Sequence, residues 1–410
     1  MYRAKKSLLG LIFSIIVLTW ATSFSNADNG LFTAIEKVPL PTEVGAQEAS
    51  LTSKDGILYM TWMEKVNTQT KVMFSMKTAS GWSEPAPVHI GYDLFVNWAD
   101  FPSISHNNIS NTFFSFNLQK SSEEIFSYDV NYFFKAKEWV DMKKIHSDNT
   151  FTEHGFVSVT PYGEGFIASW LDGRNTVPSS NGHGKGAMTL RSAEIDKEGK
   201  IINERLVDNM VCDCCQTSMT VAGGIPLLVY RDRSPEETRD IYLSRYVNSQ
   251  WTEPISIHDD GWVINGCPVN GPNIDSFEDR VVVSWFSASN GIPKVNLKFS
   301  SDKGQSFGRK IMVDNIDNKP MGRVDIEFIN KDEIIVSWLS VVDGEGKLLM
   351  RKINSMGTLG EIHTITEVST ERSTGFPQIE KWQDNIFLSW TDISGGDKRV
   401  KTSMIPLSTL

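Results

Sequence analysis

The sequence has few of the residues from which many catalytic and metal centres are built. It contains only 4 cysteines and 7 histidines among 410 residues. No stretch shows a convincing helical period, which argues against helical and α/β architectures. Basic residues are outnumbered, 40 against 50 acidic ones, and the formal net charge is −10. Such a field would repel nucleic acids and anionic membrane surfaces, so neither is an expected partner.

Long apolar runs are also scarce, and the one that stands out is near the N-terminus. Three basic residues precede the run Leu8 to Trp20, and small residues follow up to Ala27. This is the pattern of a secretory signal peptide at residues 1–27, with an uncleaved anchor as the alternative. The run is short for a membrane span of about 20 residues. We therefore expect one exported domain, residues 28–410, without a membrane span after cleavage and with no indicated oligomeric state.

A short strand that ends in an aromatic residue recurs along the chain, as in "VVVSW", "IIVSW" and "IFLSW". The terminal aromatics are spaced by 54, 54, 60, 55, 53 and 52 residues. They are Trp62, Phe116, Trp170, Tyr230, Trp285, Trp338 and Trp390. Such even spacing over seven copies indicates an array of one supersecondary unit.

Each unit contains further segments with the alternation that is typical of strands. Examples are "DIYLSRY" (Asp240–Tyr246) and "KVNLKFS" (Lys294–Ser300), both bounded by turn residues. Four strands per unit predict an all-β fold, a β-propeller of seven blades, or of six if one unit is an insertion. The last unit lacks sequence for a fourth strand. The N-terminal segment Leu31–Leu40 would supply that strand and close the ring.

Two sets of positions should meet on one face of this ring, at the mouth of its channel. They are the start of each unit and the loop after each aromatic anchor. The unusual residues fall in these places. Unit starts carry Asp100, Glu153, His154, Cys212, Cys214, Cys215, Cys267, Asn270, Arg323, Asp325 and Arg372. Loops after the anchors carry Glu64, Asp172, Arg174, Arg231, Asp232, Arg233 and Asp392. This concentration predicts a ligand site at the channel mouth.

Several segments resemble the sialidase (neuraminidase) superfamily. "SSDKGQSF" (Ser300–Phe307) has the Ser-x-Asp-x-Gly-x-Ser-Phe form of its Asp-box, also called the bacterial neuraminidase repeat. "ASWLDGR", "VYRDRS" and "SQWTEP" are similar to blade segments of sialidase-like propellers, and the resemblance covers most of units three to five. In that family the Asp-box stabilises a turn, because an aspartate bonds local backbone groups, so Asp302 implies a fold and not an activity.

The resemblance implies glycoside hydrolysis, or lyase chemistry, on an acidic sugar. Sialidases hold the substrate carboxylate with three arginines, whose planar forks donate two parallel hydrogen bonds each. Arg323 and Arg372 would hold the carboxylate, and Asp100 or His154 would be the acid or base. The other expected substrate contacts are Arg174, Arg231, Asp172 and Asn270. The family's Phe/Tyr-Arg-Ile-Pro motif and a rim tyrosine are missing. A non-catalytic propeller that binds glycan or protein is therefore the alternative.

The four cysteines lie in the entries to two adjacent units, as "CDCC" (Cys212, Cys214, Cys215) and as Cys267 in "GCPVNGP". An even number of cysteines in an exported protein favours disulfides. Complete pairing is awkward if Cys214 and Cys215 are extended, because neighbours then point to opposite faces. The other interpretation is a thiolate site for Cu(I) or Zn(II), with His154 as a further ligand. No other cofactor is expected.

Overall fold

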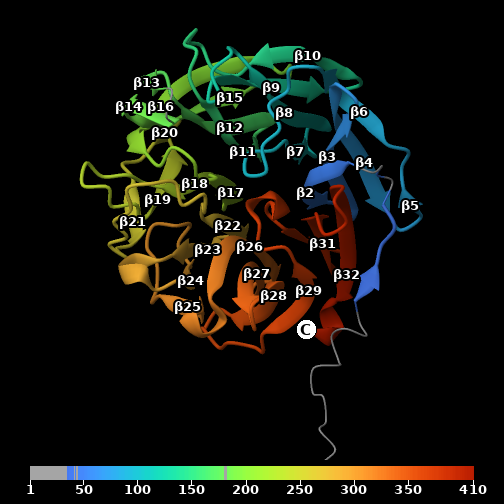
Figure 1. The fold of residues 1–410 in the computed structure, drawn as a ribbon, viewed down its shortest axis with the longest axis vertical. Helices are drawn as coiled ribbons and strands as arrows, with labels where there is room; N and C mark the ends of the chain where they lie inside the picture. The colour runs from blue at the N-terminus through green and yellow to red at the C-terminus, as the bar shows by residue number, and fades with distance from the viewer. Residues whose placement is uncertain (1–34, 41, 43–44, 180–181) are drawn as a thin grey trace, which may run out of the picture.

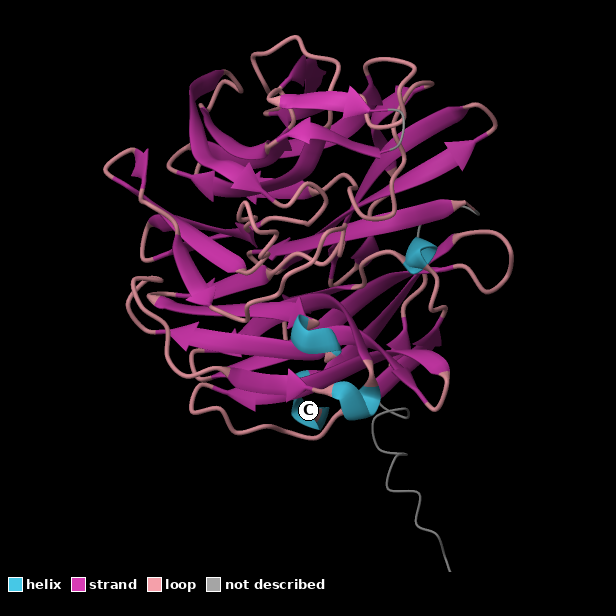
Figure 2. Cartoon of the chain, turned by 60° about the vertical axis from the view of Figure 1, so that its left-hand side comes forward, coloured by secondary structure: helices cyan, strands magenta, loops and turns pink. Residues whose placement is uncertain are grey.

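The chain folds as a ring of seven sheets around a central axis (Figure 1). The structure is a computed structural model that describes residues 35–40, 42, 45–179 and 182–410, so the predicted signal peptide at residues 1–27 lies outside the described residues. Nearly all of the regular structure in this part of the chain is strand (Figure 2). The predicted all-β propeller with seven blades is confirmed, and the six-bladed alternative is wrong.

Each blade is an antiparallel sheet, and in each one the first strand is innermost. Blade 1 consists of β2 (Ala46–Lys54), β3 (Ile57–Val66), β4 (Gln69–Thr78), β5 (Gly81–Trp82) and β6 (Ala86–Gly91), the last two both pairing with β4. Blade 2 consists of β7 (Ile104–Asn107), β8 (Thr112–Lys120), β9 (Tyr128–Lys135) and β10 (Trp139–Lys144). Blade 3 consists of β11 (His154–Tyr162), β12 (Gly165–Asp172), β15 (Met188–Ile195) and β16 (Ile201–Val211), with the hairpin β13 (Thr176–Ser179) and β14 (Gly182–Gly186) inserted after β12.

The remaining blades repeat this plan. Blade 4 consists of β17 (Ser218–Ala222), β18 (Ile225–Arg231), β19 (Ile241–Val247), β20 (Gln250–Trp251) and β21 (Ile255–His258). Blade 5 consists of β22 (Asn273–Phe277), β23 (Arg280–Ser287), β24 (Lys294–Ser300) and β25 (Ile311–Asp314). Blade 6 consists of β26 (Pro320–Asn330), β27 (Glu333–Val342), β28 (Glu345–Asn354) and β29 (His363–Val368). Blade 7 consists of β30 (Gln378–Trp382), β31 (Asn385–Asp392), β32 (Arg399–Pro406) and β1 (Glu36–Lys37).

Short helices are confined to connections. They are the 3-10 helices η1 (Ser289–Gly291), η2 (Ile316–Asn318), η3 (Arg372–Thr374) and η4 (Leu407–Thr409). None of the helices in the described residues is long and apolar enough to cross a membrane.

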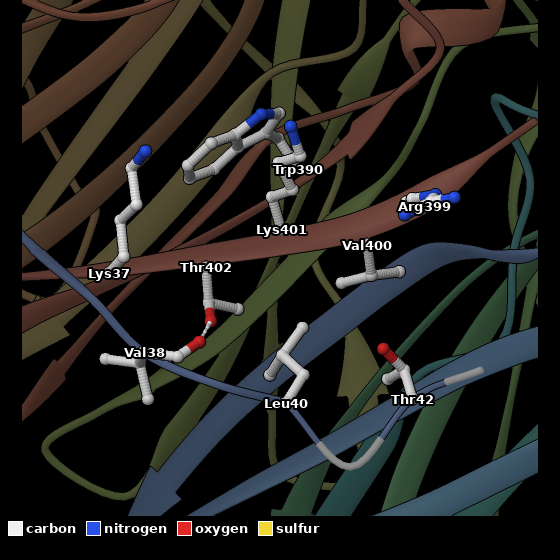
Figure 3. A pocket seen from close by; sticks show the side chains of 9 residues that line it. All are labelled: Lys37, Val38, Leu40, Thr42, Trp390, Arg399, Val400, Lys401 and Thr402. Carbon is white, nitrogen blue, oxygen red and sulfur yellow. Dashed lines mark hydrogen bonds between the residues drawn. The ribbon is translucent and has the colours of Figure 1, made fainter. Parts of the chain in front are cut away.

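The ring is closed by the N-terminal strand, as the sequence predicted. β1 pairs antiparallel with β32, with Glu36 opposite Met404. The side chain of Thr402 adds a 2.8 Å hydrogen bond to the carbonyl of Val38 (Figure 3). A cavity of about 340 Å³ lies at this seam, between the N-terminal segment and β32. The outermost strand of blade 7 therefore comes from the opposite end of the chain, so blade 7 holds the two ends of the folded domain together.

The seven aromatic anchors all lie on the second strand of a blade and are buried. In five of them, Trp62, Trp170, Tyr230, Trp285 and Trp338, the polar atom donates to a carboxylate, as a buried indole or phenol requires. Trp338 Nε1 donates to Asp314 at 2.7 Å, and Trp170 Nε1 donates to Asp172 at 2.8 Å. The repeated aromatic is thus an apolar anchor of each blade, and in five blades it also has a fixed polar partner.

Buried carboxylates join the innermost strands of neighbouring blades. Asp325 of blade 6 accepts a 2.7 Å bond from the backbone N–H of Ile379 in blade 7. Glu380 of blade 7 accepts a 2.8 Å bond from Ser53 N in blade 1. Burial raises the pKa of Asp325 to about 7 and that of Glu380 to about 8. These carboxyls satisfy backbone groups that the sheets leave unpaired, so they hold the first strands side by side around the channel.

The turn that carries the Asp-box-like motif lies after β24, on the face opposite the unit starts. Asp302 accepts bonds from the backbone N–H of Ser306 at 3.0 Å and from its hydroxyl at 2.6 Å. These bonds lower the pKa of Asp302 to about 2, although partial burial by itself would raise it. Asp302 therefore holds a turn and is remote from the channel mouth.

Candidate functional site

A cavity of about 320 Å³ lies on the axis of the ring, where the innermost strands of all seven blades meet. Each blade contributes to its wall, with Leu51, Asp100, Phe156, Gln216, Asn273, Val324 and Gln378 as representatives. Segments that are far apart in the sequence thus share one channel. Of the predicted site residues in the described part of the chain, Asp100 lines this cavity, and the others are placed individually below.

The innermost strands of blades 1, 3 and 6 begin with the same irregularity, a shift in pairing register. Inside each shift one residue other than glycine adopts the left-handed conformation: Glu48 (φ 53°), Phe156 (φ 53°) and Arg323 (φ 55°). Bulges of this kind redirect a side chain and are frequent beside functional sites, and the conformation costs about 1–3 kcal/mol. Three blades therefore use strained backbone at equivalent positions of the mouth.

Arg323 lies against an aromatic pair at this mouth. Its guanidinium is 5.0 Å from the centre of the Trp98 ring and 5.8 Å from that of Phe376. The two rings are stacked, 6.0 Å apart and inclined by 9°. In the described residues the guanidinium makes one hydrogen bond, from Nη1 to the carbonyl of Gly375 at 2.9 Å. Burial lowers the pKa of Arg323 to about 10, so it stays charged at neutral pH.

Arg323 and Lys398 both act on one buried carboxyl, that of Glu48, and Arg372 lies near Arg323; we call Arg323, Arg372 and Lys398 the cationic rim. Lys398 Nζ is 3.5 Å from Glu48 Oε1, and Arg372 is exposed but close enough to lower the pKa of Arg323 further. Burial raises the pKa of Glu48 to about 8, even though Lys398 and Arg323 oppose that shift. Near neutral pH Glu48 is largely protonated, so the positive charges are not neutralised.

Arg231, by contrast, donates hydrogen bonds to three backbone carbonyl groups. Its guanidinium donates to Asn270 O at 3.0 and 2.8 Å, to Phe286 O at 2.8 Å and to Arg239 O at 2.7 Å. It is 2% exposed and lies 4.8 Å from the centre of the Trp262 ring. Arg231 therefore ties blade 4 to blade 5 from inside the protein.

Asn270, the other candidate contact in this region, is also held by the backbone. Its Oδ1 accepts from Arg323 N at 2.7 Å, and its Nδ2 donates to Met321 O at 3.2 Å. Gly322, beside these groups, has a positive φ of 85°, and a Cβ there would lie 2.1 Å from Asn270 Oδ1. Asn270 thus supports the bulge that presents Arg323.

Asp172 and Arg174 pair with each other at the top of blade 3. Arg174 donates to both oxygens of Asp172 at 2.7 Å and to Glu204 at 2.8 Å. Burial would raise the pKa of Asp172, but the bonds from Arg174 and Trp170 and the nearby His154 lower it. Asp172 therefore anchors Trp170 and orients Arg174.

His154 belongs to a buried network between blades 2 and 3. Its ring stacks on His146, with centres 3.8 Å apart and an angle of 3°. Asp148 Oδ1 lies 2.6 Å from His146 Nδ1 and 3.2 Å from His154 Nε2, and Asp129 Oδ1 lies 3.3 Å from His146 Nε2. Histidine and aspartate are metal ligands, but parallel stacking prevents the in-plane lone pairs of both rings from meeting at one ion. Arg174 Nη2 lies 3.4 Å from Asp148, so a cation of the protein already compensates negative charge in this cluster.

Asp100 lines the axial cavity and has a tyrosine–glutamate pair close by. Asp100 Oδ2 accepts a 2.7 Å bond from Phe156 N, and burial raises its pKa to about 7. Tyr128 donates to Glu153 at 2.6 Å and is fully buried, which raises its pKa well above the ordinary value. A Cβ at Gly155 would lie 2.0 Å from Asp100 Oδ2, so only glycine fits there. Tyr128 was not predicted as a site residue, because it lies at the start of a third strand and not at the start of a unit.

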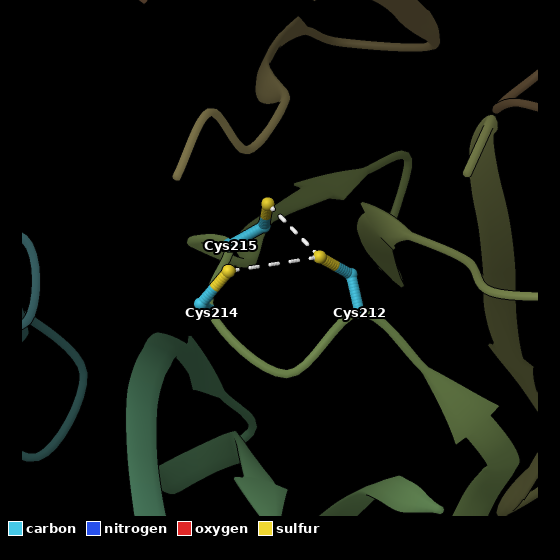
Figure 4. Close-up of side chains that lie close together, drawn as sticks. All are labelled: Cys212, Cys214 and Cys215. Carbon is cyan, nitrogen blue, oxygen red and sulfur yellow. Dashed lines mark hydrogen bonds between the residues drawn. The ribbon is translucent and has the colours of Figure 1, made fainter. Parts of the chain in front are cut away.

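The cysteines converge at the entry to blade 4 (Figure 4). Cys212 Sγ lies 3.2 Å from Cys215 Sγ and 4.0 Å from Cys214 Sγ. A side-chain hydrogen bond links Cys267 to Cys214. All four cysteines are in the described part of the chain and no disulfide joins them, so the favoured disulfides are not confirmed. The extended geometry expected for the triplet is wrong, because Asp213 and Cys214 form a turn. His154 is a member of the histidine–aspartate network instead.

Comparison with known proteins was informative only for structure. No family model matches the sequence, and no curated protein sequence does either. The solved structure of polysaccharide lyase Uly1 matches with a TM-score of 0.54 at 9% identity, over 90% of this chain and 92% of that one. The GH93 α-L-arabinofuranosidase of Fusarium graminearum, complexed with arabinobiose, matches with a TM-score of 0.50 at 12% identity, over 91% and 96%.

A leech intramolecular trans-sialidase also matches, with a TM-score of 0.47 at 13% identity, over 90% of this chain and 69% of that one. At such low identities these likenesses describe the fold alone. The predicted β-propeller fold is confirmed.

Proposed function

We propose that this chain is an exported propeller that binds an acidic carbohydrate at the mouth of its channel. The carboxylate of the ligand would be held by Arg323 and Arg372, and a sugar ring would lie against Trp98 and Phe376. The signal-peptide pattern at residues 1–27 supports export, and an N-terminus at Asp28 in protein isolated from outside the cytoplasm would test it.

The observation that carries this proposal is the uncompensated charge of the cationic rim. The chain as a whole has a formal charge of −10, yet Arg323 and Lys398 lie around one carboxyl whose pKa is about 8, and Arg372 lies near Arg323. In the described residues Arg372 makes no ion pair, and Arg323, although only 6% exposed, has one protein acceptor, the carbonyl of Gly375. Arginine is suited to grip a carboxylate through two parallel bonds.

The aromatic residues support a sugar as the bearer of that carboxylate. Phe101 and Phe376 line the axial cavity, and Trp98 stacks on Phe376. Ligand pockets typically combine such apolar walls with a few polar groups that fix orientation. Two proteins that share the fold carry the names of carbohydrate-active enzymes, which is consistent with this choice.

Binding without turnover fits the geometry better than hydrolysis. Tyr128 is sealed inside the protein, and its raised pKa makes it a poor nucleophile at neutral pH. His154 is enclosed by carboxylates. One observation favours a second candidate, a glycoside hydrolase or lyase: Asp100 lines the cavity with a pKa of about 7, which suits a general acid.

Calorimetric titration with acidic and neutral oligosaccharides would test the proposal. We expect acidic oligosaccharides to bind, Arg372→Ala and Arg323→Ala to weaken binding about 10-fold or more, and Arg280→Ala to have no effect. Arg280 is the matched control because it is a partly exposed arginine at the start of β23, paired with Asp332 at 3.0 Å. Equal binding of neutral sugars, or insensitivity to both rim variants, would reject the proposal.

The same titrations decide between binding and catalysis. Product analysis after prolonged incubation should show an unchanged oligosaccharide. Cleavage that is lost in Asp100→Asn would establish the second candidate instead, with binding retained by that variant.

A further inference from the structure

Three sulfur atoms at the entry to blade 4 are spaced like the ligands of one metal ion. With Zn–S bonds of about 2.3 Å, two ligands of a tetrahedral site are about 3.8 Å apart. Cys212 Sγ is 3.2 Å from Cys215 Sγ and 4.0 Å from Cys214 Sγ, and all three lie within 4.8 Å of one another (Figure 4). A disulfide would require about 2.05 Å. These separations fit a shared ion better than a bond between any two sulfurs.

The backbone holds this triangle at both ends. β16 ends at Val211, and Cys212 N donates to Arg231 O at 3.0 Å. After the turn, the side chain of Gln216 donates to Ala99 O at 2.7 Å and accepts from Gly271 N at 3.1 Å. The turn is therefore fixed between three blades, which is the rigidity that a preformed site needs.

Arginine side chains balance the negative charge of thiolates at this position. Arg239 Nη1 lies 3.2 Å from Cys212 Sγ, and Glu237 orients the same guanidinium at 2.8 Å. The thiolate is the form that binds metals. A guanidinium within 3.2 Å of Cys212 Sγ is therefore placed to balance the charge of a sulfur ligand.

Cys267 offers the fourth sulfur from the neighbouring loop. It precedes blade 5 and is hydrogen-bonded to Cys214. The triplet is buried, with 1%, 7% and 2% exposure for Cys212, Cys214 and Cys215, whereas Cys267 is partly exposed. Arg231 ties this loop to blade 4 through Asn270 O. Cys267 thus lies on the solvent side of the three buried cysteines, where a metal ion would enter.

We propose that Cys212, Cys214, Cys215 and Cys267 form a thiolate site for one soft, closed-shell metal ion, Zn(II) or Cu(I). Sulfur-only ligand sets select such ions, and the closed, four-ligand arrangement is typical of a structural site. Binding would replace the remaining thiol protons, which go to solvent. The cysteines pack in the same hydrophobic cluster as Trp98 and Phe376, but metal content is measured without a carbohydrate, so the two proposals are tested independently.

Metal and thiol counts on the full-length protein, purified without chelators from its own compartment, would test the site. We expect about one zinc or copper ion per chain, and thiols that react only after a chelator removes the ion. Chain mass lower by the four hydrogens of two disulfides, with no metal, would overturn the proposal. Four thiols that react at once in a chain that takes up neither Zn(II) nor Cu(I) at one equivalent would also overturn it.

Variants locate the ligands even if a buried cysteine is needed for folding. Cys267→Ser, at the partly exposed position, should fold and lose at least 10-fold in Zn(II) affinity in competition with a chromogenic chelator. Cys214→Ser should lose at least as much. Asp213→Asn, in the same turn but without sulfur, is the matched control and should keep the affinity. Unchanged Zn(II) affinity in both cysteine variants, with folding verified by circular dichroism, would contradict the assignment.

Discussion

The two sides of the channel mouth differ in what their arginines already bind. On the side of blades 6, 7 and 1, Arg323 makes a single backbone bond and Arg372 is exposed. On the side of blades 3 to 5, Arg231 makes four bonds to carbonyls and Arg174 is locked by carboxylates. The arginine at the unit start therefore makes one hydrogen bond to the protein, whereas the arginine at the end of a second strand makes four.

The difference arises from the number of acceptors within reach. Arg231 ends a second strand, where the carbonyls of the next blade's entry surround it. Arg323 sits in a bulge over two aromatic rings, which offer no strong acceptor. A neighbouring acid would normally neutralise it, but burial keeps Glu48 largely protonated near neutral pH. In the described residues Arg323 therefore keeps one protein acceptor and has no ionised partner near neutral pH.

The largest effect should come from Arg231. Arg231→Ala would leave three carbonyl groups in the protein interior without a donor, and we expect it to lower the free energy of unfolding by about 3–5 kcal/mol. Arg372→Ala, the matched control on the other side, should change it by no more than about 0.5 kcal/mol. Urea denaturation monitored by tryptophan fluorescence measures both. Similar losses in the two variants would remove the contrast between the two sides.

A smaller effect is expected at Asp172. Asp172→Asn weakens the hold on Arg174 while leaving an acceptor for Trp170, and we expect a loss of about 1–3 kcal/mol in stability. The affinity for an acidic oligosaccharide should not change. A stable variant that has lost binding would instead make Asp172 a ligand contact.

The pH dependence of stability should reveal Glu48. Its pKa is about 8 in the folded chain and near 4.5 when unfolded, so the folded state holds the proton more tightly. The resulting stabilisation is complete below pH 4.5 and is lost as the pH rises through 8. Asp100 and Asp325, with pKa values of about 7, act in the same direction. Stability should therefore fall from pH 5 to pH 8.5.

The variant Glu48→Gln measures how much of this pH dependence of stability comes from Glu48 alone. Because the amide does not ionise, the variant should lose stability less steeply with pH. At pH 8.5 it should exceed the wild type by about 1 kcal/mol or more. Parallel pH profiles of the two proteins in urea denaturation would show that Glu48 is not the buried acid inferred here.

The smallest effect is the response of ligand binding to salt. Arg372 is exposed, so its attraction to a carboxylate is screened, and affinity should fall several-fold between low and physiological ionic strength. Arg372→Ala should flatten this dependence. The measurement is a set of calorimetric titrations at three salt concentrations, and a steeper dependence in the variant would contradict the role of Arg372.

Most of the fold could be predicted from the sequence, because it follows from one repeated requirement. Each blade buries an aromatic residue on its second strand, so the anchors from Trp62 to Trp390 keep the period of the ring. The closure by Leu31–Leu40 was predictable as well, since the last unit lacked one strand. These features depend on which residues are apolar and on how many strand segments each unit contains, and both can be read directly from a sequence.

The site was predictable only in its location. Arg231 and Arg323 were both predicted to contact the substrate, and only the structure shows that Arg231 is bound to backbone carbonyls while Arg323 has a single acceptor. Glu48 and Lys398 were missed because their roles depend on a blade interface formed by opposite ends of the chain. The turn in "CDCC" did carry a signal, since Asp213 is a typical turn residue. Side-chain partners across blades are set by packing, and a linear pattern does not show them.

The most direct test of the central claim compares one uronate-containing oligosaccharide with its carboxyl-reduced, neutral form. Both would be titrated into the wild-type protein at pH 7, where the cationic rim is charged and Glu48 largely protonated. The account predicts that the acidic form binds at least about 10-fold more tightly and that Arg323→Ala removes this preference. Equal affinities for the two forms in the wild-type protein would contradict it.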